Sequence, residues 1–179
     1  KELELKYTRE ASAAANAQAE AQFDTLKHIV PIETYAKRQS FNSLAEVGIH
    51  AMDQSQHNPN IKKDIFIAPE HIFPEMGYGS HPDELIELVQ KGRQRMVKYL
   101  TSPYIDDPHG RRYSEAQKAE AAKFGKKEGD YIMIKNDYYR KDLSKEEARK
   151  MADRHIKATL DTQHLGMWRK HMQRLFLRE

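Results

Sequence analysis

Two short segments, residues 65–68 and 156–160, constrain the fold of this chain more than any other feature. The first is short and apolar enough to predict a strand buried on both faces, and the second predicts another short strand. Between them, apolar residues recur with helical spacing from Leu85 to Leu100. Strand, helix and strand in this order predict parallel neighbours joined by a right-handed crossover, the unit of α/β barrels and doubly wound sheets.

Helical patterns fill much of the remaining chain. Residues 1–27 are rich in Ala, Glu and Gln and contain no Gly or Pro, which predicts a weakly buried N-terminal helix. Ser80 is placed to cap a helix over residues 83–100. A capping box that begins at Ser144 predicts a helix over residues 144–154. A last helix is expected after residues 156–160. The chain is therefore expected to be helix-rich.

The segment 101–142 lacks this periodicity and is rich in Tyr, Lys, Asp and Gly. We interpret it as an insertion in a single α/β domain that spans residues 1–179.

Acidic residues follow both predicted strands. Glu70 lies two residues beyond the predicted strand at residues 65–68, and Asp161 directly follows the predicted strand at residues 156–160. The carboxyl ends of neighbouring parallel strands meet at one edge of a sheet about 5 Å apart, so the two carboxylates could hold one divalent ion. His164 could join them from the next loop. The alternative is that Glu70 caps a turn, Asp161 caps the last helix and His164 is an ordinary first-turn residue; we favour the metal site.

Three other residues are candidates for substrate binding. Glu75 and His81 flank a glycine-containing turn and either line a pocket or face water. Trp168 could stack on a sugar ring, although a tryptophan at this position more often packs between a helix and a sheet.

Composition narrows the chemistry and the compartment. With no cysteine, any metal must be bound by carboxylate and imidazole groups, and a reducing compartment is favoured. The formal charge of +3 is too small to favour nucleic acid as a partner. No run approaches the roughly 20 apolar residues that span a bilayer, so we expect a cytoplasmic protein without a membrane partner.

Two segments resemble a known superfamily. Residues 67–82 and 159–168, the latter with an Asp-Thr-x-His motif, resemble the xylose isomerase-like barrels, particularly archaeal sugar phosphate isomerase-like members. In that superfamily a strand-end Glu and the Asp of the motif are metal ligands, and the His binds metal or substrate. Glu70, Asp161 and His164 match these positions.

The resemblance implies a partial TIM barrel of the xylose isomerase-like type. It also implies a metal-dependent isomerase or epimerase that acts on a sugar or sugar phosphate with Mn, Zn or Mg. The family completes its site with a His and a Glu on later strands, and a whole barrel needs eight strands and about 250 residues, whereas this sequence offers two or three strands.

Two alternatives therefore stay open. One is an endonuclease IV-like phosphodiesterase that repairs DNA. The other is a non-catalytic scaffold or subunit, in which a homo-oligomer or a partner chain completes the barrel and covers its exposed edges.

Overall fold

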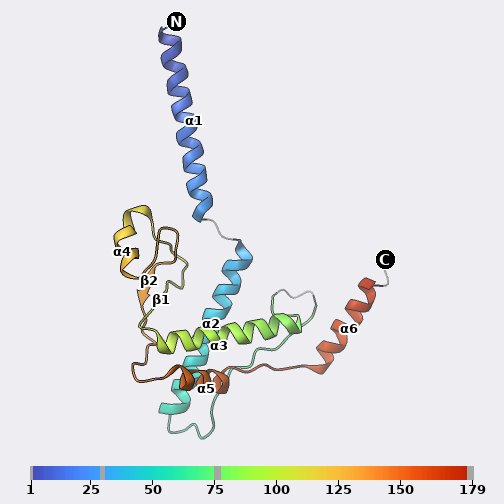
Figure 1. The fold of residues 1–179 in the computed structure, drawn as a ribbon. Coiled ribbons are helices and arrows are strands. Elements are labelled where there is room, and N and C mark those ends of the chain that lie inside the picture. The colour runs from blue at the N-terminus through green and yellow to red at the C-terminus, as the bar shows by residue number, and fades with distance from the viewer. Residues whose placement is uncertain (1, 29–30, 75–77, 177–179) are drawn as a thin grey trace.

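The computed structural model describes residues 2–28, 31–74 and 78–176 and is mainly helical (Figure 1). Its α-helices are α1 (Glu2–His28), α2 (Ile32–His57), α3 (Pro82–Thr101), α4 (Lys118–Lys123), α5 (Lys145–His155) and α6 (Thr162–Phe176). A short 3-10 helix, η1 (Glu115–Gln117), precedes α4, and strands β1 (Tyr104–Asp106) and β2 (Met133–Lys135) pair with each other.

Helices α2, α3 and α5 pack together around the apolar core. Glycines allow the helices to approach closely: a Cβ on Gly48 of α2 would lie 2.7 Å from a side-chain carbon of Ile156, and a Cβ on Gly92 of α3 would lie 2.6 Å from Leu44. The largest apolar or aromatic side chains that are fully buried in this cluster are Ile49, Met96, Tyr99, Leu100 and Ile156.

The segment between α3 and α5 forms an antiparallel hairpin, with Ile105 opposite Ile134. Ile105 is buried in the same core as the helices, and Ile134 packs against it. The buried side chain of Asn136 donates hydrogen bonds to the carbonyls of Tyr99 and Ser102. These bonds satisfy carbonyls at the C-terminal end of α3, so they fix the hairpin to that end of the helix.

Helix α1 projects away from the packed helices (Figure 1). Its side chains are exposed wherever the structure describes them, including Leu3, Leu5 and Tyr7. This agrees with the prediction of a weakly buried N-terminal helix. Among the described residues, none of the helices is both long enough and apolar enough to cross a bilayer.

The prediction of an α/β fold and a partial TIM barrel is wrong. Within the described ranges the sheet content is one small antiparallel pair, and no barrel is present. The segments expected as buried parallel strands do run side by side, but they form only isolated parallel bridges, Ile67 to Ile156 and Glu70 to Thr159.

Pro69 gives a physical reason why this pairing stays minimal. Ile67 donates to the carbonyl of His155, Lys157 donates to that of Ile67, and Thr159 donates to that of Pro69. The next bond of a regular parallel ladder would need an N–H at position 69, which proline lacks. Phe66 and Leu160 are 48% and 60% exposed, so the segments are also not buried on both faces.

The helices around these segments lie close to the predicted positions. Helix α5 begins after the capping box of Ser144 and Glu147, as expected. Helix α3 begins one residue later than Ser80 would require, because its N-cap is His81 and Ser80 is buried.

Candidate metal centre

The two paired segments bring Glu70, Asp161 and His164 together. One potential ligand atom from each residue lies within 4.8 Å of the other two. Glu70 itself forms the parallel bridge with Thr159, and Asp161 lies two residues further along that second segment. The predicted approach of the two carboxylates is confirmed, although two extended segments produce it rather than a barrel rim. Their role as metal ligands stays a prediction.

Asp161 is also the N-cap of α6. Its Oδ1 accepts hydrogen bonds from the backbone N–H groups of Gln163, at 2.6 Å, and His164, at 3.3 Å. The Gln163 N–H has the largest effect and lowers the pKa of Asp161; burial opposes it, and the His164 N–H lowers the pKa further, so the pKa lies below its usual value. The carboxylate is therefore ionised at neutral pH. Capping occupies Oδ1, while Oδ2 lies 3.9 Å from His164 Nδ1.

His164 is held in one orientation by its surroundings. Its Nδ1 lies 2.9 Å from the carbonyl oxygen of His71 and 3.7 Å from Glu70 Oε1. A carbonyl can only accept, so this bond places the proton on Nδ1 and leaves the lone pair on Nε2. Nδ1 is also the ring nitrogen that lies 3.7 Å from Glu70 and 3.9 Å from Asp161, so His164 would bind a metal through it only after Nδ1 loses its proton and its bond to the His71 carbonyl. The ring of Phe73 lies against it, with centroids 4.9 Å apart.

The donor set fits a hard or borderline divalent ion. Two carboxylates and one imidazole are ligands that Mn, Zn and Mg accept, at bond lengths of about 2.0–2.2 Å. One ligand atom of each residue lies within 4.8 Å of the others, so the two carboxylates could hold such an ion, and His164 could join them if its ring turned or released the His71 carbonyl. Glu70 and Asp161 have side chains that are 39% and 31% exposed, so water or a substrate could reach the remaining coordination positions.

His71, for which the sequence pattern indicated no role, lies beneath this cluster. It is fully buried, and neither ring nitrogen has a hydrogen-bond partner among the described residues. Its ring contacts that of His164 edge to face, with centroids 5.8 Å apart. The sequence does indicate that His71 faces away from Glu70, because neighbouring side chains of an extended segment point to opposite sides. Only tertiary packing decides that this opposite side is the buried one.

The residues expected to bind substrate have structural roles wherever they are described. The His81 ring accepts a hydrogen bond from the N–H of Asp83 at the start of α3. Trp168 Nε1 donates to the carbonyls of Ile72, at 3.1 Å, and Ser80, at 2.9 Å. Trp168 thus fastens α6 to the loop before α3. Glu75 lies outside the described residues.

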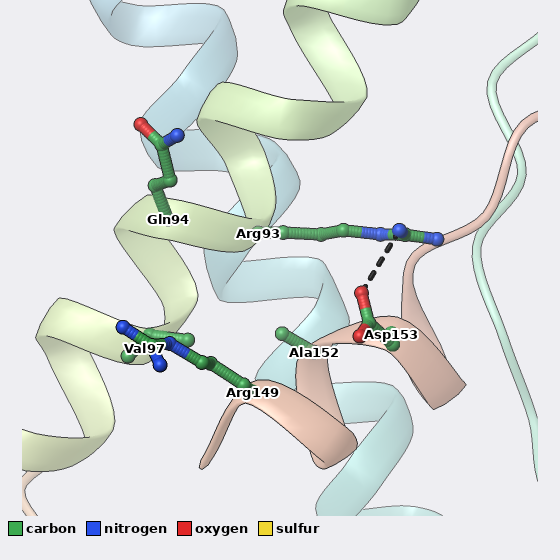
Figure 2. Close-up of a pocket in the computed structure, with 6 residues that line it drawn as sticks. All are labelled: Arg93, Gln94, Val97, Arg149, Ala152 and Asp153. Carbon is green, nitrogen blue, oxygen red and sulfur yellow. Dashed lines mark ion pairs between the residues drawn. The ribbon is translucent and has the colours of Figure 1, made fainter. Parts of the chain in front are cut away.

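A separate hollow of about 330 Å³ lies between α3 and α5. Figure 2 shows Arg93 extending across it to Asp153, with a nitrogen–oxygen distance of 2.9 Å. The same guanidinium donates through Nε to the carbonyl of Ile156. Asp153 already neutralises the positive charge of Arg93. We therefore interpret this hollow as a result of the packing of α3 on α5 and not as a binding site.

Comparison of the chain with protein-family models, with curated proteins and with solved structures found no match. The resemblance to the xylose isomerase-like superfamily therefore stays a prediction that depends on the two sequence segments.

Proposed function

We propose that this protein binds one divalent metal ion through Glu70, Asp161 and His164 and catalyses the isomerisation or epimerisation of a sugar or sugar phosphate. The observation that carries the proposal is that Glu70, which is distant in sequence, meets Asp161 and His164 with one potential ligand atom of each residue within 4.8 Å of the others. The proposal does not depend on a barrel.

The chemistry follows from the three side chains. A bound divalent ion would polarise a carbonyl and its neighbouring hydroxyl, which lowers the barrier to a proton or hydride shift. Glu70 and Asp161 would hold the ion with negative charge, and His164 would orient the substrate or serve as third ligand. The His71 carbonyl and the Phe73 ring keep the His164 imidazole in place for this role.

The proposal is tested first by metal binding and only then by catalysis. Asp161→Asn removes the charge but keeps a good N-cap residue, so α6 should remain folded. We expect Mn or Zn affinity, measured by titration calorimetry, to fall by more than about tenfold. The control is Asp83→Asn, which changes an exposed carboxylate in the first turn of α3. Unchanged affinity in Asp161→Asn, or an equal loss in the control, would remove the metal site.

If the metal binds, the metal-loaded protein is incubated with a panel of aldose and ketose sugars and their phosphates. We expect interconversion that disappears in Glu70→Gln. Tight metal binding without turnover of any of these compounds would retain the metal site and reject the isomerase activity.

A further inference from the structure

A second concave surface lies far from the candidate metal centre. It has a volume of about 220 Å³ and is lined by Thr34, Tyr35 and Arg38 from the start of α2, and by His109, Arg112 and Tyr131 from the hairpin region. The hairpin follows the C-terminal end of α3, whereas α6 lies toward the other end of that helix (Figure 1), where its Trp168 bonds to the carbonyl of Ser80.

Two guanidinium groups in this pocket share one aromatic ring. The central carbon of the Arg38 guanidinium lies 3.8 Å from the ring centroid of Tyr131, and that of Arg112 lies 4.6 Å from the same centroid. Each cation is attracted to the electron-rich ring, but the two positive charges are thereby brought close together. Two positive charges beside the same ring repel each other, and a bound anion would offset this repulsion.

Within the described part of the chain, no carboxylate forms an ion pair with Arg38 or Arg112. The nearby carboxylate of Asp107 is instead occupied by Arg111, through its Nε at 3.0 Å, its Nη2 at 3.1 Å and its backbone N–H at 2.9 Å. Arg38 bonds to the backbone carbonyl of Asp107, not to its side chain. The pocket therefore carries two positive charges without internal compensation, in contrast to the Arg93–Asp153 pair of Figure 2.

The two guanidinium groups are also held in place. Arg112 Nη1 donates to the carbonyl of Gly129 at 2.7 Å. Gly110 has a φ of +81°, and a Cβ there would lie 3.3 Å from Arg38 Nη1, so the hairpin backbone passes directly against this guanidinium. Each guanidinium has five N–H donors, of which the backbone carbonyls take only part. The remaining donors are fixed in direction and need little ordering to bind a ligand.

We propose that this pocket binds the phosphate group of a small phosphorylated compound. A phosphate carries a charge near −2 and several acceptor oxygens, so it matches two arginines that are already positioned. Thr34 and Tyr35, which also line the pocket, carry hydroxyl groups that can donate hydrogen bonds. The volume of about 220 Å³ is below that of typical pockets for drug-sized ligands, which favours a small ligand.

The test is titration calorimetry of the full chain with inorganic phosphate and with glycerol phosphate. Arg112→Gln keeps a polar side chain of similar shape but removes the charge. We expect it to weaken phosphate binding by at least about tenfold. Arg149→Gln is the matched control, because Arg149 is an exposed helical arginine outside this pocket. Arg38→Lys provides a second variant. It keeps the positive charge but loses the planar arrangement of several N–H donors, so it should also bind phosphate more weakly.

Thermal unfolding of each variant is followed by circular dichroism, so that loss of binding is not confused with loss of fold. The proposal is supported if either phosphate compound binds saturably, and if Arg112→Gln weakens this binding whereas Arg149→Gln does not. Absence of saturable binding of either compound, or equal weakening by Arg112→Gln and Arg149→Gln, would overturn it. None of these outcomes depends on the candidate metal centre.

Discussion

Asp106, at the end of β1, illustrates how a single partly buried charge is stabilised in this protein. Its side chain is 17% exposed and lies 2.7 Å from Lys98 Nζ and 3.6 Å from Arg95 Nη1. Burial alone would raise the pKa of Asp106, but the hydrogen bond from Lys98 and the charges of both cations outweigh it and lower the pKa. Since α3 supplies both cations, this carboxylate links the hairpin to that helix.

We expect Asp106→Asn to lower the free energy of unfolding at neutral pH by about 1–2 kcal/mol, because it replaces a charge-assisted bond with a neutral one. A lowered folded-state pKa stabilises the fold above the unfolded pKa of about 3.9 and ceases to do so as pH falls through the folded-state value. The difference between the two proteins should therefore shrink below about pH 4 in urea titrations. A difference that stays constant across pH, or that the exposed-site variant Asp137→Asn reproduces, would contradict this account.

At the scale of elements, the close packing around α2 and α3 depends on a glycine in each of these helices. Gly48 of α2 faces Ile156 and Met96, and a Cβ there would lie 2.8 Å from Ile156 Cδ1 and 3.1 Å from Met96 Sδ. Both neighbours are fully buried, so neither has free space into which it can move. In contrast, a Cβ added to Gly166 of α6 would have no atom within 4 Å apart from its own helix and chain neighbours.

Alanine has a higher helix propensity than glycine by about 1 kcal/mol, so both glycine-to-alanine changes would be stabilising in an isolated helix. We expect Gly48→Ala to destabilise the protein by about 1–3 kcal/mol, because overpacking of a dense core exceeds the propensity gain. Gly166→Ala should leave the midpoint of thermal unfolding unchanged or raise it. The prediction fails if calorimetric melting shows the same shift for the two variants.

At the scale of the whole molecule, the cooperative unit is formed by α2, α3, α5 and the hairpin. Their buried residues form one apolar cluster, to which the described residues of α1 make no contribution. Helix α1 is long but exposed, and it extends from the remainder of the molecule (Figure 1). An isolated helix gains little stability when it buries no apolar face.

We therefore expect removal of residues 1–28 to change the free energy of unfolding of the remaining chain by less than about 0.5 kcal/mol. Helical circular dichroism should fall in proportion to the residues removed, while the urea midpoint stays constant. A clear drop in the midpoint would show that α1 packs on the core in solution. Leu100→Ala is the positive control, since this fully buried core residue should cost about 2–5 kcal/mol.

The sequence by itself determined the local elements. Apolar residues at helical spacing identified α3, and the capping box of Ser144 identified α5, nearly to their ends, because these signals act between residues a few positions apart. The expected Ser80 cap of α3 was wrong, since His81 caps that helix. The same local reasoning located the two extended segments, and their parallel pairing brings Glu70 to Asp161. The sequence alone was therefore sufficient to predict that the residues of the candidate metal centre lie close together.

Only the tertiary structure decided what those segments build. A barrel would require further strands and regular pairing between the two extended segments, and Pro69 lacks the N–H that the next bond of such pairing needs. The structure instead has a helical core, and the two segments form only isolated bridges. The burial of His71 and the sharing of Tyr131 by Arg38 and Arg112 likewise depend on which distant residues meet. Local periodicity reports which face of a segment is apolar, whereas packing between distant segments selects the partner, since that choice minimises exposed surface over the whole chain.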